Sequence, residues 1–331
     1  MNDTGPSALL FLKKFGILLV LLSLILFFAL TTQAFFTVTN LFNIARQVSM
    51  LGIAAVGMTF VMITGGIDLS VGSLLSIINV IGAFSMVKFG VHPVLAVAIC
   101  LACACLLGLL NGAIVTDINI PPLIATLGTM TIIRGLSYII TGGLPIYGFP
   151  DNFSVIGQGY LWVIPIPVVI MFVIVALGSF ILNSTFFGRL FYAIGGNEEA
   201  TRLSGANIRG LKYLVYALSG FTAGIAGVIL LSRVNSGQPI AGSGFELDVV
   251  TAVVLGGVSI SGGEGSLSGA FTGVLIMGVL SNGLIIMNVG EYYQLVIKGT
   301  VLLCAVGFDR MQRNADRPGA KLSPKNAQKA V

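Results

Sequence analysis

The chain has 331 residues, of which 56% are hydrophobic and only 9% charged, and its mean hydropathy is +1.01. Globular domains in water carry roughly 25% charged residues, so the composition excludes a soluble domain and indicates an all-α polytopic membrane protein. The net charge of +5 does not indicate a nucleic-acid partner, because basic residues in membrane proteins mainly set topology.

Apolar runs of the length that crosses a bilayer as a helix recur along the chain. Separated at polar and Gly/Pro-rich breaks, they predict about ten transmembrane helices of roughly 20 residues each. The expected spans are 12–31, 48–64, 69–87, 93–115, 121–141, 161–183, 213–232, 247–262, 268–288 and 292–309. We expect the first to be retained as a span, because no small-residue cleavage site follows it.

Lysine and arginine are concentrated near both ends of the chain and between the sixth and seventh expected spans. Loops on the cytoplasmic side of a membrane are enriched in these residues. We therefore expect both termini and the loop 184–212 to be cytoplasmic. Residues 1–310 are expected to form one transmembrane domain, and the polar, basic tail 311–331 to be a disordered cytoplasmic end.

Two glycine-rich breaks lie inside the apolar part of the chain and are similar to each other. Ile63–Gly72 reads ITGGIDLSVG, and Ile260–Gly269 reads ISGGEGSLSG. Transporters are often built from repeated halves with broken helices near the pathway. The pair therefore suggests an internal repeat, with a chance likeness of Gly/Ser-rich turns as the alternative.

Asp68 lies in the first of these breaks. Gly65 and Gly66 permit the break, after which Asp68 or Ser70 can cap a helix that starts at Leu69. A carboxylate inside a membrane is costly unless it is paired or in contact with water. Asp68 is therefore expected either to line a solute path or fix the broken helix beside it, or to be a plain helix cap at a cytoplasmic turn.

Other polar side chains interrupt apolar runs. Arg134 and Lys298 are expected to face protein or water rather than lipid. The acidic residues that could pair with them are Glu246, Asp248, Glu264 and Glu291. Asparagines in apolar runs could bind a hydroxyl-rich solute or only bridge helices. The candidates for a translocation path are Asp68, Ser70, Asn79, Arg134 and Asn282.

Glycines one helical turn apart form the pairs Gly220/Gly224 and Gly269/Gly273. Such pairs let helices approach closely in lipid. They could form a seam between two copies of the chain or pack helices within one copy.

Several kinds of site are missing from the sequence. The chain contains no G-x-x-x-x-G-K-[ST] phosphate-binding loop. His92 is the only histidine, which argues against a metal cluster and against a Ser/His/Asp catalytic arrangement. Three cysteines within 100–105 lie in an apolar run and are expected to pack as small apolar side chains. We expect no metal, no bound cofactor and no enzymatic activity in this chain.

The longest polar interruption is Ser184–Tyr213, in which Gly195 and Gly196 are expected to form a turn. After this turn, Asn197 is a favourable N-cap for a helix that starts at Glu198.

Glu198 is expected to pair with Arg202 four residues later, and Gly205 to end the helix in a left-handed conformation. A helix of about two turns is too short to be stable alone in water. We expect the neighbouring spans and a docking partner to hold it, with an ordinary polar loop as the alternative.

Three long stretches carry a resemblance to a known family. They are GMTFVMITGGIDLSVGSLL (57–75), FGRLFYAIGGNEEATRLSGANI (187–208) and GFELDVVTAVVLGGVSISGGEGSLSGAFTGVLIMG (244–278). They resemble the membrane subunits of bacterial ABC importers for monosaccharides, which include permeases for ribose, xylose, galactose and autoinducer-2. The likeness extends from about Phe35 to Gly307, and the ribose permeases are the nearest in pattern.

The resemblance implies a homodimer of permease subunits in the bacterial inner membrane that passes a small sugar, with a pentose such as ribose favoured. It implies a separate ATPase subunit, which would hold ATP and Mg, and a periplasmic sugar-binding protein. In such permeases, the loop that matches Gly188–Gly205 carries the helix that couples to the ATPase. The coupling residues implied are Gly188, Arg189, Gly195, Gly196, Asn197, Glu198, Arg202 and Gly205.

Three other functions stay open. A secondary sugar transporter driven by an ion gradient would account for the repeat and the charges within spans. A permease of the same family for a hexose or for autoinducer-2 would share the framework. An exporter or channel of another class is suggested only by the glycine-broken helices.

Overall fold

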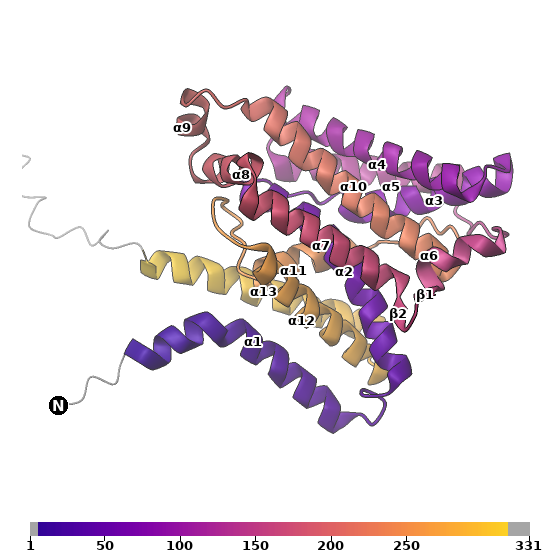
Figure 1. Ribbon diagram of the computed structural model, residues 1–331, viewed down its shortest axis with the longest axis horizontal. Helices are drawn as coiled ribbons and strands as arrows, with labels where there is room; N and C mark the ends of the chain where they lie inside the picture. The colour runs from indigo at the N-terminus through magenta and orange to yellow at the C-terminus, as the bar shows by residue number, and fades with distance from the viewer. Residues whose placement is uncertain (1–5, 317–331) are drawn as a thin grey trace, which may run out of the picture.

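The computed structural model describes residues 6–316, and most of them lie in helices (Figure 1). The helices are α1 (Pro6–Thr31), α2 (Val38–Ile63), α3 (Val71–Phe89), α4 (Pro93–Thr116), α5 (Pro122–Thr141), η1 (Asp151–Ser154), α6 (Val155–Gln158), α7 (Ile166–Ser184), α8 (Phe186–Gly196), α9 (Glu198–Leu203), α10 (Ile208–Val234), α11 (Phe245–Leu255), α12 (Leu267–Ile286) and α13 (Glu291–Asp316). Two short strands, β1 (Tyr160–Leu161) and β2 (Ile164–Pro165), pair antiparallel. The all-α polytopic class is confirmed, whereas the tail 311–331 lies mostly outside the described residues.

Seven helices of the described part are long and apolar enough to cross a bilayer: α2, α3, α4, α5, α7, α10 and α12. In α1, the apolar stretch is the shorter segment Gly16–Thr31. The expectation of about ten spans is therefore not confirmed.

Several helices start at other residues than expected. In α2 and α7, local structure explains the difference. α2 begins at Val38 rather than 48, where the Thr37 hydroxyl accepts a hydrogen bond of 3.4 Å from the Asn40 N–H. α7 begins at Ile166 rather than 161, because 160–165 form the β1–β2 hairpin. Trp162, at the turn of this hairpin, is 95% exposed, as suits an aromatic residue at a membrane–water interface.

The expected continuous span 247–262 is wrong. α11 ends at Leu255 after 11 residues, which is about 16 Å at 1.5 Å per residue and roughly half of a 30 Å hydrocarbon core. Gly256 and Gly257 stop the helix, and Gly257 has the left-handed φ of 84° that glycine adopts without strain.

The residues before α11 do not complete the missing half of this helix. Residues 235–244 instead run beside α3, fixed by side chains of that helix. The Gln238 N–H donates a hydrogen bond of 2.7 Å to Asn79 Oδ1, and Ser76 Oγ donates one of 2.6 Å to the Pro239 carbonyl. The segment that contains α11 is therefore not one continuous helix across the bundle.

The glycine pairs pack helices within one copy of the chain. A Cβ on Gly220 would overlap the Ala104 carbonyl of α4, so α4 and α10 are in backbone contact. Gly273 of α12 is held in the same way against the Ala252 carbonyl of α11. The alternative in which these pairs form a seam between copies has no support here.

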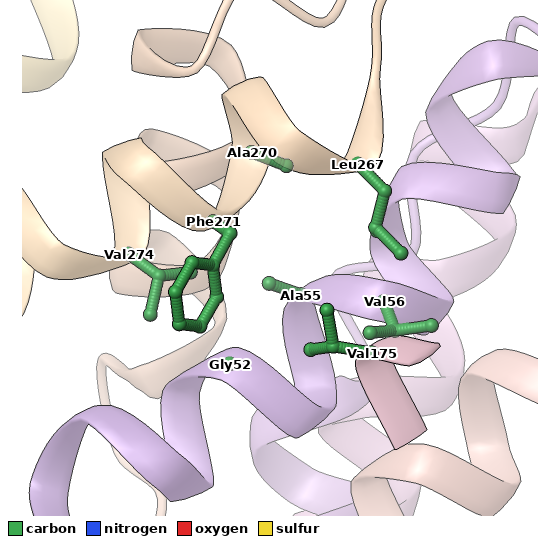
Figure 2. A pocket seen from close by; sticks show the side chains of 8 residues that line it. All are labelled: Gly52, Ala55, Val56, Val175, Leu267, Ala270, Phe271 and Val274. Carbon is green, nitrogen blue, oxygen red and sulfur yellow. The ribbon is translucent and has the colours of Figure 1, made fainter. Parts of the chain in front are cut away.

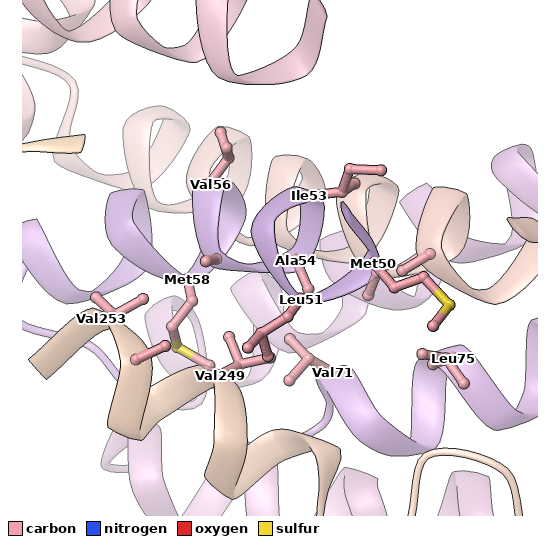
Figure 3. Close-up of a cluster of buried hydrophobic side chains, with 14 of the residues drawn as sticks. Met50, Leu51, Ile53, Ala54, Val56, Met58, Val71, Leu75, Val249 and Val253 are labelled. Atoms are coloured by element: carbon pink, nitrogen blue, oxygen red, sulfur yellow. The ribbon is translucent and has the colours of Figure 1, made fainter. Parts of the chain in front are cut away.

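α2 is the central helix of the bundle, and every residue from Val48 to Ile63 is buried. Figure 3 shows part of this core, where methionines and aliphatic side chains of α2 pack against Val71 and Leu75 of α3 and Val249 and Val253 of α11. Figure 2 shows the other side of α2, where small residues face α7 and α12 across a gap too narrow for a water molecule.

The two ends of the bundle differ. α8 and α9 lie at one end, and the free ends of α1 and α13 lie on that same side (Figure 1). The β1–β2 hairpin and α6 lie at the opposite end (Figure 1). The polar loop 184–212 and the two terminal helices therefore share one side of the bundle.

Candidate functional site

The loop 184–212 contains two helices rather than one. α8 starts after Thr185, whose hydroxyl accepts a hydrogen bond of 3.4 Å from the Gly188 N–H. A Cβ on Gly188 would overlap the Leu182 carbonyl, so a tight reversal joins α7 to α8. The guanidinium of Arg189 lies 5.8 Å from the centre of the Phe186 ring. α8 buries Phe191 and Ile194 and is thus anchored to the bundle.

Gly195 and Gly196 do not form the expected turn, because they are the last two residues of α8. The chain turns at Asn197, whose φ of −160° and ψ of 100° leave the helical region. Asn197 Oδ1 accepts a hydrogen bond of 2.9 Å from the Ala200 N–H, which confirms Asn197 as the N-cap of α9.

The charges of α9 pair differently from the expectation. Arg202 Nη2 lies 2.7 Å from Glu199 Oε1, and Glu198 Oε1 lies 2.7 Å from Lys212 Nζ of α10. The expected Glu198–Arg202 pair is wrong, because Lys212 of the adjoining helix is the nearer partner of Glu198. α9 is thereby tied to α10.

The end of α9 presents an apolar side chain to solvent. Gly205 has a φ of 88°, which confirms the left-handed stop. The Gly205 N–H donates to the Arg202 carbonyl at 3.0 Å, and the Ala206 N–H donates to the Thr201 carbonyl at 3.4 Å. This cap leaves Leu203 79% exposed.

α8 is in backbone contact with both glycine-rich breaks. A Cβ on Gly195 would overlap the Ile63 carbonyl oxygen and the Gly263 amide nitrogen. The Gly263 N–H itself donates a hydrogen bond of 2.9 Å to the Ile63 carbonyl. Tyr192, on the preceding turn of α8, donates a hydrogen bond of 2.8 Å to the Gly265 carbonyl. We call this contact of Ile63, Gly195 and Gly263 the glycine junction.

The glycine junction was not foreseen from the sequence. Its only signal there is that a Gly-Gly pair occurs in each of three distant segments, at 65–66, 195–196 and 262–263. Both breaks join two helices, α2 to α3 and α11 to α12, and they touch each other at this junction. The shared placement agrees with the suggested repeat, which stays a prediction.

Asp68 is fully buried in a cluster of hydrogen-bond donors. Its Oδ1 accepts from the Ser70 N–H at 3.0 Å and from Ser70 Oγ at 2.5 Å, and its Oδ2 accepts from Ser219 Oγ of α10 at 2.7 Å. Asn111 of α4 donates to Ser70 Oγ at 2.8 Å. The cluster therefore joins the first break to α4 and α10.

The expected helix start at Leu69 is wrong, because α3 begins at Val71. Ser70 occupies the N-cap position but makes no side-chain cap hydrogen bond. Beside the cluster, the Tyr216 hydroxyl is buried against Gly66 and has no hydrogen-bond partner among the described residues.

Two further path candidates also have partners inside the protein. Asn79 holds the segment before α11, as described above. Asn282 of α12 and Asn40 of α2 exchange two amide hydrogen bonds, of 3.0 and 3.1 Å. Asp68, Ser70, Asn79 and Asn282 are thus buried and bonded to other residues, and their place on a path remains a prediction.

Two ion pairs meet the first turn of α11. Arg134 Nη2 of α5 lies 3.3 Å from Glu246 Oε1, with the Arg134 side chain 33% exposed. Lys298 Nζ of α13 lies 2.7 Å from Asp248 Oδ2, with both side chains 22% exposed. The sequence left these pairings open, and the structure assigns them.

These features define a polytopic membrane protein, in which the short helix α11 carries acidic residues that are paired with basic residues of α5 and α13. Residues 40–306 match the family described as branched-chain amino acid transport system / permease component, and the chain belongs to this family.

Several curated proteins are similar over most of their length. The ribose import permease protein of Bacillus subtilis (strain 168) is 44% identical over 301 residues, which cover 90% of this chain and 93% of that protein. The ribose import permease protein of Escherichia coli (strain K12) is 44% identical over 300 residues, covering 89% and 93%. The L-arabinose transport system permease protein of Escherichia coli (strain K12) is 38% identical over 304 residues, covering 92% of each. No solved structure matches the chain.

Proposed function

We propose that this chain is the permease subunit of an ATP-driven importer that carries ribose across the inner membrane of a bacterium. The observation that carries the proposal is the 44% identity to ribose import permeases over 90% of the chain. The chain supplies the path through the membrane, and a separate ATPase subunit supplies the energy. L-Arabinose is the second candidate substrate, on the 38% identity to an L-arabinose permease.

In this proposal, α9 is the part that contacts the ATPase. It lies on the side shared by the free ends of α1 and α13 (Figure 1), where basic residues of the sequence are concentrated, so that this side faces the cytoplasm. The exposed Leu203 offers an apolar contact, and Glu199 and Arg202 of the same short helix form an exposed ion pair. A displacement of α9 would pass through α8 to the glycine junction and from there to both breaks.

The proposal includes two further partners. A sugar-binding protein would deliver the solute at the opposite, periplasmic end, where α6 and the β1–β2 hairpin lie. A second copy of the chain would complete the transporter, with lipid around the pair. The roles of Gly188, Arg189, Gly195, Gly196, Asn197, Glu198, Arg202 and Gly205 in coupling belong to this proposal.

Transport by a reconstituted system tests the proposed function. The chain would be placed in proteoliposomes with its ATPase subunit and its sugar-binding protein, and uptake of ribose, L-arabinose, xylose and galactose would be measured. We expect ribose uptake that requires ATP and both partners. Uptake by the chain alone that collapses with an ion gradient would instead establish a secondary transporter.

A further inference from the structure

The broken helix leaves unfilled space at the middle of the bundle. A cavity of about 200 Å³ lies at the N-terminal end of α11, lined there by Phe245 and Asp248. Met50 also lines it and is close to the midpoint of the 26-residue α2. The segment 235–244 follows α3 rather than continuing the axis of α11, and its residues Gly242 and Ser243 form another wall.

The cavity is large enough to admit a few water molecules or a small polyol. Apolar side chains from α2, α3 and α10, those of Met50, Leu75 and Leu230, form most of the remaining wall, as in binding sites that orient a small molecule with a few polar groups.

The polar groups of the wall have unused hydrogen-bonding capacity. Asp248 gives Oδ2 to Lys298, and no donor among the described residues is bonded to Oδ1. The Ser243 hydroxyl likewise has no hydrogen bond to any described residue. Lys298 lies close enough to balance the charge of Asp248, and Asp248 Oδ1 can still accept a hydrogen bond.

This combination selects one ligand chemistry. An anionic solute would be repelled by Asp248. Ser243 is exposed and the Asp248 side chain is 22% exposed, so an apolar solute that covered them would remove both oxygens from water without giving them hydrogen-bond partners, which is costly. A polyhydroxylated solute donates hydroxyl hydrogens to the carboxylate and places its C–H groups against Phe245 and Leu75.

We propose that this cavity is a binding site for a monosaccharide on its way through the membrane, with Asp248 Oδ1 and Ser243 Oγ contacting its hydroxyl groups. The proposal rests on the proposed function and names where the solute is held. Neither residue was among the path candidates of the sequence, and Lys298 acts here as the partner that keeps Asp248 in place.

The first test compares two substitutions that affect the cavity with one that does not. Asp248→Asn removes the charge of the acceptor, and Leu230→Trp fills the cavity from α10. Leu214→Trp places the same side chain at a partly buried leucine of α10 that does not line the cavity. In the full transport complex, we expect Asp248→Asn and Leu230→Trp to lower ribose uptake about tenfold, with unchanged ATPase association, and Leu214→Trp to retain uptake.

The second test does not depend on ATP. Ser243→Cys in the full chain, in liposomes, would be exposed to a small water-soluble thiol reagent, with the parent chain as the control for its own cysteines. We expect ribose to slow labelling of the new cysteine, and an alditol of the same size to slow it also, whereas a carboxylate of that size does not.

The outcomes separate the two proposals. Labelling that ribose does not slow, together with normal uptake by Asp248→Asn and Leu230→Trp, would overturn the binding site while the importer stands. Protection of Ser243→Cys without any ATP-dependent uptake by the parent would support the site and overturn the proposed importer.

Discussion

Gly195 and Ile63 are in direct backbone contact, although 131 residues lie between them in the chain. The hydrogen bond from Gly263 to the same Ile63 carbonyl adds a third segment. The end of α8, the end of α2 and the loop before α12 therefore meet at one point, with no side chain between them.

The first prediction concerns this contact. Gly195→Ala should lower the thermal unfolding temperature of the detergent-solubilised protein by several degrees, because its methyl group overlaps the Ile63 carbonyl and the Gly263 amide. Gly196→Ala is the matched control, since no atom lies within 4 Å of a Cβ at Gly196. Equal unfolding temperatures for both variants would show that the glycine junction opens without cost.

The second prediction concerns the buried cluster at Asp68. Asp68→Asn keeps the size of the side chain but turns one acceptor into an NH₂ donor facing a serine that also donates. We expect the protein to lose about 1–3 kcal/mol of stability and to transport more slowly, because the first break is no longer fixed to α10. Thermal unfolding and uptake would be measured in parallel, with Ser219→Ala as a milder variant that removes one donor. Unchanged stability and unchanged uptake in Asp68→Asn would show that Asp68 is only a turn residue.

The third prediction concerns the exposed end of α9. Leu203→Asp should weaken co-purification with the ATPase subunit at least tenfold while leaving membrane insertion and unfolding temperature unchanged, because Leu203 makes few contacts within the chain. Leu144→Asp, at a leucine that is 71% exposed elsewhere, is the control. If Leu203→Asp co-purifies with the ATPase subunit as strongly as the unmodified chain does, α9 is not part of the proposed contact. Glu198→Lys and Arg202→Glu should act in the same direction.

The fourth prediction concerns the amide pair of α2 and α12. Asn40→Ala and Asn282→Ala each leave a buried amide without its partner, so the double variant should lose less stability than the two single variants together. Pairs of this kind in membrane proteins contribute about 0.6 kcal/mol on average. A double-mutant cycle on thermal or chemical unfolding measures the coupling, and strictly additive losses would contradict the reciprocal hydrogen bonds.

The fifth prediction is a pH dependence. Hydrogen bonds from Tyr213, and then from Arg209, hold the pKa of Asp117 below its ordinary value. A depressed pKa means that the unfolded chain binds this proton at a higher pH than the folded one, so the stabilisation is present above about pH 4. It should disappear as the pH falls through the lowered pKa. The difference in unfolding temperature between the parent and Asp117→Asn should be constant near neutral pH and vanish in acid. A constant difference at all pH values would contradict the ionised pair.

Local chemistry could be predicted from the sequence where neighbouring residues decide it. The N-cap at Asn197 and the left-handed Gly205 were predicted, because each depends on residues within one turn. The partner of Glu198 was not predicted, since Lys212 reaches it from the next helix.

The break in α11 was missed for a related reason. The stretch after Glu246 is apolar enough to read as a continuous span. In the structure, the left-handed Gly257 ends the helix, and Gly256 packs against Gly269. The partners of Arg134 and Lys298 lie on α11, far away in the chain, so that no spacing rule identifies them. The binding-site proposal depends on the path of residues 235–244 and on the Asp248–Lys298 pair, which sequence patterns do not give.

The absence of side chains at the glycine junction has a mechanical consequence. Where helices meet through long side chains, rotamer changes can absorb a small displacement before the backbone responds. At the contact of Gly195 with Ile63 and Gly263, there is no rotamer to change. In the proposed function, α8 would therefore move as one stiff unit. A displacement of α9 would reach the C-terminal end of α2 and the loop before α12 almost undiminished.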